Sequence, residues 1–488
     1  MLVSVVVARS LGPSEMGRYA FLVWVAALAP VALSLGLPTV LGRYAAEALG
    51  ARRPQEAGAL FLSVLRWQLT AATVFAAAMV AAAILPGLDR AWRAPLVLTA
   101  VCVWLLILHG ATNAFLSALR SFRRPAMIGT LQLGLLAVLA AAAAAGGGGV
   151  TRFLAAHALS TAAGVAGLLT FAWREGRTQG ALPAPAGLPA TLRIEVIGYA
   201  RSVLPLLVLD AIVWQRSEVA FLRAFAAPAA VAYYALAYGL ASQMSRLPYQ
   251  ITLVLTPAFP TLVGAGRLGE LASLHATAVR YLLLLGTPLA AGMAIVAPRL
   301  VAVLYGIEYA PAAPVLTLLA LGFVPSFAAG LSPAVVHATK HQRRLVSQAW
   351  CAATVNVGLA FLLVPVAGAI GAALANVTAQ TLQATLVLWT ATRITSASLR
   401  PGRLVRIGAA TVVMSAMAAV AMHALPGLAG LVAAVVAGAI GYVLGLRLFH
   451  ALDAEDLDRM RVLLERLPVR FRPVGLDIAT RLCCAPGR

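Results

Sequence analysis

Charged residues are scarce in this sequence: Asp, Glu, Lys and Arg make up only 11% of its 488 residues. A soluble domain usually has about a quarter of its residues charged, so the composition excludes an ordinary soluble fold. Hydrophobic residues reach 61% instead, and the mean hydropathy is +0.91. Apolar runs long enough to cross a bilayer, which takes about 20 helical residues, recur along the chain. The sequence therefore predicts an all-α polytopic membrane protein.

Signatures of enzymes and cofactor sites are also lacking. The four cysteines follow no disulfide or metal-ligand spacing. The sequence has no GxxxxGK[ST] motif for nucleotide hydrolysis and no evident Ser/His/Asp grouping. We therefore expect no enzymatic activity and no cofactor or metal. The net charge of +21 comes from 37 basic against 16 acidic residues. Because the basic residues are spread over many short loops, we attribute them to membrane topology rather than to nucleic-acid binding.

Clusters of Gly, Pro and Arg divide the apolar runs into about fourteen predicted transmembrane helices. The first, residues 1–11, would reach only about 16 Å, so we expect a truncated first helix. Basic residues gather in the loops after the even-numbered spans, among them Arg52, Arg267, Arg280 and Lys340. The positive-inside rule places these loops and the C-terminus in the cytoplasm.

A weak internal repeat suggests two related halves. At an offset of 215, Pro13 aligns with Pro228 and Tyr19 with Tyr234. The predicted halves are two six-helix bundles related by a pseudo-twofold axis along the membrane normal, an architecture known among transporters. The predicted domains are an N-terminal bundle at 1–173, a cytoplasmic linker at 174–197, a C-terminal bundle at 198–393, two extra transmembrane helices at 394–450 and a cytoplasmic tail at 451–488.

The last predicted span contains two glycines four residues apart, Gly441 and Gly445. Small residues at this spacing let two membrane helices approach closely. We therefore expect this face of the span to pack against another helix.

Three charged residues interrupt the predicted span at 198–222, in the stretch "DAIVWQRSEVAFL" from Asp210. A charge at the centre of a spanning helix costs about 2.5–3.5 kcal/mol, and such groups usually face a bundle interior or a water-filled cavity. On a regular helix Arg216 would lie about 160° from Glu218, so these two could not pair there. Either all three charges pair with other helices and serve folding, or at least one faces a cavity.

Polar side chains follow helical spacing in several other spans. In the predicted span at 230–262, for example, Ser242, Arg246 and Gln250 recur at intervals of four residues. Each stripe alone fits interhelical hydrogen bonding, whereas stripes in both halves together favour a hydrated cleft. The candidate cavity residues are Arg43, Arg66, Asn113, Arg216, Arg246, Gln250, Asn356 and Asn376.

Four segments resemble a known family: "ARSLGPSEMGRYAF", "GLPTVLGRYAAE", "VAYYALAYGLAS" and "LYGIEYAPAAPVLTLLAL". They are similar to the oligosaccharide flippase, or polysaccharide biosynthesis, family of the multidrug/oligosaccharidyl-lipid/polysaccharide export superfamily. The likeness runs from Ala8 to about Ile394. It implies a flippase that moves a polyprenyl-diphosphate-linked oligosaccharide across the cytoplasmic (inner) membrane of a prokaryote by alternating access. Expected partners are the lipid-linked glycan, membrane lipids, and glycosyltransferases or a polymerase of the same pathway, but no nucleic acid. The short first helix departs from the family pattern.

The charges suit such a substrate, because the arginine fork can donate two hydrogen bonds to a diphosphate. In this interpretation Asp210 and Glu218 hold the arginines in place or bind a coupling proton or Na⁺. One alternative is a multidrug cation antiporter of the same superfamily, in which the two acids bind the cation. Two others are a non-transporting membrane scaffold for glycan assembly and a membrane-embedded glycan polymerase.

Overall fold

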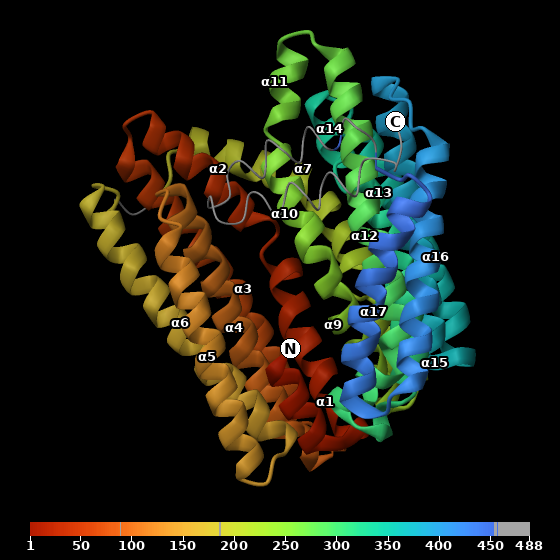
Figure 1. Cartoon of the computed structure of the whole chain (residues 1–488). Helices are drawn as coiled ribbons and strands as arrows, with labels where there is room; N and C mark the ends of the chain where they lie inside the picture. Colours follow the sequence, from red (N-terminus) through yellow and green to blue (C-terminus); the bar gives the residue numbers. More distant parts are fainter. Residues whose placement is uncertain (88, 185–186, 453–455, 457–488) are drawn as a thin grey trace, which may run out of the picture. The chain divides into compact units, whose positions relative to one another are not determined.

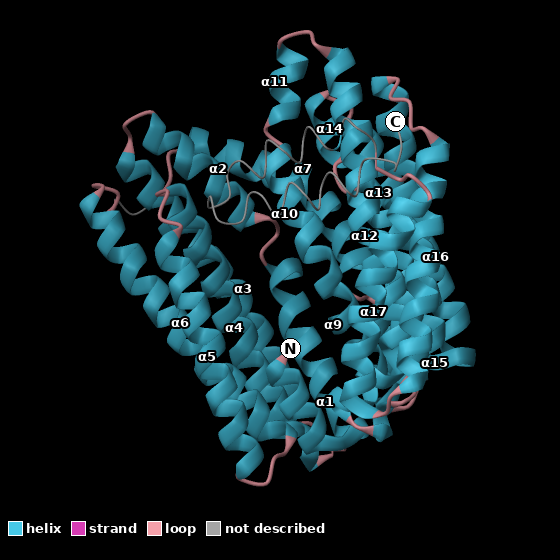
Figure 2. Cartoon of the chain, viewed as in Figure 1, coloured by secondary structure: helices cyan, strands magenta, loops and turns pink. Residues whose placement is uncertain are grey.

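The computed structural model describes residues 1–87, 89–184, 187–452 and 456, which contain helices and no strand (Figures 1 and 2). Two compact units divide the chain. The first unit comprises Met1–Ala235 and Ala360–Ala372, and the second comprises Leu236–Leu359 and the chain from Ala373 onward. The predicted tail at 451–488 falls outside the described residues, apart from Ala451, Leu452 and Asp456.

Both units are built from long apolar helices joined by short connections (Figure 2). The first unit contains α1 (Leu2–Leu33), α2 (Leu37–Gly50), α3 (Pro54–Ile84), α4 (Arg90–Ala118), α5 (Arg123–Ala145), α6 (Val150–Thr178), α7 (Ala190–Trp214) and α8 (Glu218–Phe225). The second contains η1 (Ser242–Ser245), α10 (Arg246–Leu255), α11 (Ala258–Gly264), α12 (Leu268–Tyr305), η2 (Ile307–Tyr309), α13 (Ala312–Ala329), α14 (Ser332–Ala338), α16 (Pro401–Ala424) and α17 (Gly427–Leu448). Helices α9 (Pro228–Ala241) and α15 (Gln342–Thr395) contribute to both.

The helix count agrees with the predicted polytopic architecture. Among the described residues, 10 helical segments are long and apolar enough to cross a membrane. Two of them contain a backbone break at a glycine, Gly12 with φ 70° in α1 and Gly368 with φ 51° in α15. Glycine adopts such angles without steric cost. The Gly12 break lies where the predicted first span ends. The Gly368 break divides α15, whose 54 residues would otherwise extend about 80 Å, into two spans.

Two predicted spans are wrong as continuous helices. The span at 198–222 is interrupted, because α7 ends at Trp214 and α8 begins at Glu218. The span at 230–262 is divided into α9, η1, α10 and α11. The 3₁₀ turn η1 has about three residues per turn, so it also breaks the regular spacing expected from Ser242 to Gln250. The predicted loop position of Arg280 is wrong as well, since this residue lies inside α12.

The compact units divide the chain at positions other than the predicted bundle boundaries. Helix α6 runs to Thr178 and α7 begins at Ala190, so helices occupy both ends of the predicted linker at 174–197. Helices α7 and α8 fall in the first unit rather than the second. The six-helix bundles at 1–173 and 198–393 stay a prediction.

Aromatic and aliphatic side chains form a buried core in the first unit, where α2, α3 and α4 meet. Phe61 and Phe115 stack with their ring centroids 4.3 Å apart. Leu41, Leu60 and Leu116 surround them and are almost fully buried. This core holds the three helices that carry Arg43, Arg66 and Asn113.

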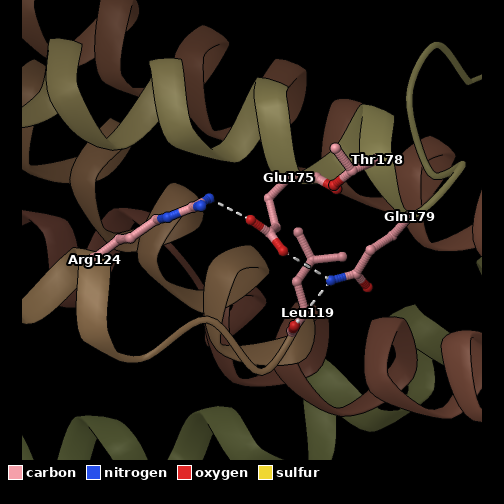
Figure 3. A network of polar contacts seen from close by, with 5 residues as sticks. All are labelled: Leu119, Arg124, Glu175, Thr178 and Gln179. Atoms are coloured by element: carbon pink, nitrogen blue, oxygen red, sulfur yellow. Dashed lines mark hydrogen bonds and ion pairs between the residues drawn. The ribbon is translucent and has the colours of Figure 1, made fainter.

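A polar network at one end of the first unit joins α4, α5 and α6 (Figure 3). Arg124 at the start of α5 pairs with the carboxylate of Glu175 on α6. The Gln179 amide donates to the other Glu175 oxygen at 3.3 Å and to the carbonyl of Leu119 at 3.2 Å. The last carbonyls of a helix have no N–H partner within the helix. The Gln179 amide supplies a donor for the Leu119 carbonyl at the end of α4.

The predicted packing face of α17 is confirmed. A Cβ atom added to Gly445 would lie 2.7 Å from the Cα of Ala410, and one added to Gly441 would lie 2.8 Å from the sulfur of Met417. Both neighbours belong to α16. Helices α16 and α17 thus pack closely through the small-residue face of α17.

Candidate functional site

The break between α7 and α8 is the main candidate site, because three predicted residues lie on or beside it. Arg216 lies in the turn with φ 60°, a left-handed conformation. A residue with a side chain adopts it at a cost of about 1–2 kcal/mol. Glu218 is the first residue of α8, and Asp210 lies in the last turns of α7. The side chain of Asp210 is outside the described part of the structure.

Hydrogen bonds from side chains stabilise this break. The indole N–H of Trp24 on α1 donates to the carbonyl of Gln215 at 2.6 Å. The Ser217 hydroxyl donates to the carbonyl of Ile212 at 2.7 Å. Within the turn, the backbone N–H of Val219 donates to the carbonyl of Arg216 at 3.0 Å. Interrupted membrane helices need such partners, because lipid cannot satisfy the freed backbone groups.

The carboxylate of Glu218 is fully buried and accepts a hydrogen bond of 2.9 Å from the hydroxyl of Tyr234 on α9. Tyr234 is itself among the largest fully buried side chains. The first turn of a helix favours a negative charge, because its unpaired N–H groups carry partial positive charge. On a regular helix Glu218 would lie about 160° from Arg216. The break removes the regular 100° rotation on which that placement depended.

Helices α1 and α4 contact the end of α8 and the start of α9. A Cβ on Gly17 would lie only 1.8 Å from the carbonyl oxygen of Pro228, the first residue of α9, so the two backbones approach closely. The guanidinium groups of Arg18 and Arg223 lie 5.5 Å and 5.0 Å from the ring centroid of Trp92. These distances are typical of cation–π contacts. The sequence analysis missed Trp24, Trp92 and Arg223, because their roles depend on contacts between residues far apart in the chain.

Arg43 contacts the first half of α7. Its guanidinium lies 4.7 Å from the ring centroid of Tyr199 on α7 and 5.6 Å from that of Tyr44. The hydrogen bond with Tyr199 raises the pKa of the exposed Arg43 guanidinium, so the group stays charged at physiological pH. Tyr44 also borders a hollow of about 250 Å³ that Glu47, Arg53 and Glu195 line. This hollow is polar and of mixed charge.

The remaining candidates in the first unit lie apart on two helices. Arg66 on α3 is exposed, with a long contact of 3.5 Å to the Ser63 hydroxyl. Asn113 on α4 is also exposed. Their exposure is compatible with a cleft-facing role, which stays a prediction.

The candidates in the second unit divide into exposed and buried pairs. Arg246 and Gln250 are exposed on α10. Asn356 and Asn376 are buried within α15, with 0% and 1% of their surface exposed. The Gln380 amide donates to Asn376 at 2.9 Å. The burial of the two asparagines favours hydrogen bonding between packed helices over contact with a ligand.

The described residues contain no evident metal site. Within the described residues, no group of three or more His, Cys, Asp or Glu side chains lies close enough to hold an ion. Binding of a coupling proton or Na⁺ at Asp210 or Glu218 stays a prediction.

The fold and the interrupted α7–α8 segment define a polytopic membrane protein with charged residues at a helix discontinuity. Its architecture is similar to two solved transporters. One is described as the lipid II flippase MurJ in an inward closed conformation, with a TM-score of 0.69 and 12% identity over 92% of this chain and 95% of that one. The other is described as a multidrug resistance MATE family transporter of the MOP superfamily in an inward-facing conformation, with a TM-score of 0.66 and 15% identity over 81% of this chain and 94% of that one.

Sequence comparison then gives the family. The model of the family described as "Polysaccharide biosynthesis protein" matches residues 6–314. The chain belongs to this polysaccharide biosynthesis protein family, as its resemblance predicted. A search of curated protein sequences found no significant match.

Proposed function

We propose that the chain is a flippase that moves a polyprenyl-diphosphate-linked oligosaccharide from the cytoplasmic to the outer leaflet of a prokaryotic cytoplasmic membrane. The movement occurs by alternating access and supplies a polysaccharide or surface glycan for export. The observation that carries the proposal is Arg216, a cation in a left-handed turn between α7 and α8. Membership of the polysaccharide biosynthesis protein family and the MurJ-like architecture support it.

Arg216 suits a diphosphate for electrostatic and geometric reasons. Guanidinium and phosphate form paired, charge-assisted hydrogen bonds that are about twice as strong as neutral ones. Discontinuous membrane helices recur at transporter substrate sites. Part-burial of Arg216 reduces competition from water, which strengthens its attraction for an anion. The hydrogen bonds to the carbonyls of Gln215 and Ile212 stabilise the turn that contains Arg216.

Helix α7 connects two cationic positions in the first unit. Arg43 contacts Tyr199 in the first half of the helix, and Arg216 follows Trp214 at its C-terminal end. The 15 residues between Tyr199 and Trp214 span about 22 Å as a helix. This length exceeds one diphosphate group. We assign Arg43 to initial capture of the headgroup and Arg216 to a later position along its path, while exposed Arg66, Asn113, Arg246 and Gln250 contact the glycan.

A multidrug cation antiporter is the second candidate function. The observation in its favour is the fully buried carboxylate of Glu218, together with the MATE-like architecture. A buried acid is the chemistry that binds a proton, Na⁺ or an organic cation. In the flippase, Glu218 serves instead to order α8 through Tyr234, or to bind a coupling ion together with Asp210.

Reconstitution into proteoliposomes distinguishes these functions. A lipid-diphosphate oligosaccharide and a cationic dye are followed separately across the membrane for the unaltered protein and for the double variant Asp210→Asn/Glu218→Gln. The flippase predicts lipid movement without dye efflux. Dye efflux that the acid variant abolishes, with no lipid movement, would establish the antiporter instead. Loss of lipid movement in the acid variant alone would assign ion coupling to these acids, and movement of neither compound would favour the scaffold.

A further inference from the structure

A basic hollow in the second unit is lined by none of the residues assigned above to the glycan lipid. It has a volume of about 370 Å³ and lies between the first half of α12 and the segment that joins α15 to α16. Arginine and hydroxyl side chains predominate among its polar lining. These residues are Ser273, Thr277, Arg280, Ser398, Arg400 and Arg403.

Arg280 forms the buried wall of this hollow, with 7% of its surface exposed. Its Nη2 atom donates to the carboxylate of Asp456 and to the carbonyl of Ala451 at 3.3 Å. The hydroxyl of Tyr281 also donates to Asp456, at 2.5 Å. The Nε atom of Arg280 is buried and has no hydrogen-bond partner among the described residues. A buried donor left without an acceptor costs about 1–3 kcal/mol.

The charges around the hollow favour an anionic acceptor. Three arginines, Arg280, Arg400 and Arg403, line it. Helix α16 begins directly after Arg400, so its positive dipole end adds to the local potential. Several N–H donors, together with the hydroxyls of Ser273 and Thr277, match the oxygens of a phosphate group.

An apolar hollow adjoins the basic one. Its volume is about 460 Å³, and Ser273 and Thr277 on α12 line both hollows. The second hollow is lined mainly by Ile251, Leu255 and Leu274, with Glu270 at its edge. Glu270 is already paired with Arg267 through two contacts of 2.6 Å. A basic hollow that continues into an apolar hollow suits an amphiphile, whose phosphate would lie in the first and whose apolar part would lie in the second.

We propose that these adjoining hollows bind an anionic phospholipid, with its phosphate between Arg280, Arg400 and Arg403 and the start of an acyl chain against Leu255 and Leu274. The positive-inside count assigns this end of α12 to the cytoplasmic leaflet, where anionic lipids attract basic groups. The bound lipid is a ligand distinct from the transported glycan lipid, because none of the residues that line the two hollows is assigned to the glycan lipid.

Lipid binding to the full-length protein in detergent tests the phosphate contacts. Dissociation constants are measured for dioctanoyl phosphatidic acid and dioctanoyl phosphatidylcholine, with the unaltered protein and with Arg400→Gln/Arg403→Gln. We expect phosphatidic acid to bind at least about tenfold more tightly than phosphatidylcholine, and the double variant to lose roughly tenfold or more, because charge-assisted hydrogen bonds are removed. The control is Arg343→Gln/Arg344→Gln, which removes the same charge from exposed positions on α15. Equal losses in both variants would overturn the proposal.

A steric variant tests whether the ligand is a lipid rather than free phosphate. Ser273 is exposed and lines both hollows, so Ser273→Trp obstructs them without changing any charge. We expect phosphatidic acid to bind at least about tenfold more weakly to this variant. Inorganic phosphate is the second probe, and it should bind far more weakly than the lipid to the unaltered protein. Equal affinity for inorganic phosphate and phosphatidic acid would overturn the lipid assignment. Arg280 is left unaltered, because its loss would leave Asp456 buried without its cation.

Discussion

Tyr234 donates a 2.9 Å hydrogen bond to the carboxylate of Glu218, and both side chains are fully buried. The contact joins the first turn of α8 to the middle of α9. It therefore fixes the far side of the turn that contains Arg216. The sequence separates the two residues by only 16 positions, yet a regular helix through 198–222 would not have predicted their contact.

The first prediction concerns the energy of this hydrogen bond. A double-mutant cycle of Tyr234→Phe and Glu218→Leu should give a coupling free energy of about 1.5–3 kcal/mol, the range for hydrogen bonds to charged groups. The measurement is unfolding of the purified protein in detergent. Tyr249→Phe serves as the control, because Tyr249 is 58% exposed. A coupling below about 0.5 kcal/mol would show that Tyr234 does not hold Glu218.

The second prediction concerns the turn itself. Trp24→Phe removes the N–H that donates to the Gln215 carbonyl, at a net cost of about 1 kcal/mol. The backbone N–H of Val219, which bonds to Arg216, should then exchange with deuterium roughly fivefold faster, as 1 kcal/mol of local stability implies. Trp350→Phe, at a position 57% exposed, should leave this exchange unchanged. Equal exchange in both variants would argue against a role for Trp24 at the break.

The third prediction concerns the close approach of α1 and α9. A Cβ at Gly17 would lie 1.8 Å from the Pro228 carbonyl oxygen, so Gly17→Ala should destabilise the protein by at least about 2 kcal/mol through overpacking. Gly110→Ala is the matched control, because a Cβ there meets nothing within 4 Å. That variant should be neutral or up to about 1 kcal/mol more stable, since alanine favours helix. Comparable thermal stability of the two variants would contradict the packing of Gly17.

The fourth prediction concerns the network in Figure 3. The side chains of Arg124 and Glu175 are 45% and 23% exposed, so water and salt screen their attraction. Glu175→Gln should therefore cost no more than about 1 kcal/mol. The difference in unfolding free energy from the unaltered protein should shrink as the salt concentration is raised from 0.05 to 1 M, because the screening length becomes roughly fourfold shorter. A loss that is large and independent of salt would show that the hydrogen bond from Gln179 to Glu175 matters more than the ion pair.

Apolar run length and glycine spacing were sufficient to predict much of the fold. The break at Gly12 precedes a proline, and the small-residue face of Gly441 and Gly445 follows a recognised spacing. Both features depend on residues close together in sequence. The membrane-spanning helices can be predicted from hydropathy for the same reason.

The candidate site was predictable only in part. Its charges at Arg216 and Glu218 are conspicuous in an apolar stretch, whereas the break between them is not marked by glycine or proline. Trp24 stabilises the break from 191 positions away, and local sequence carries no sign of that contact. Asn356 illustrates the opposite difficulty, because spacing alone did not distinguish a cleft-facing amide from the buried one observed.

The central claim is that Arg216 binds the diphosphate during transport, and its most direct test is movement of a lipid-diphosphate oligosaccharide in proteoliposomes. Arg216→Gln should slow arrival in the opposite leaflet by at least about tenfold, because one charge-assisted contact of 1.4 kcal/mol or more is lost. Arg216→Lys should recover part of the rate, since the charge returns without the fork. The exposed-site variant Arg343→Gln should transport normally. Normal transport by a folded Arg216→Gln protein would contradict the account.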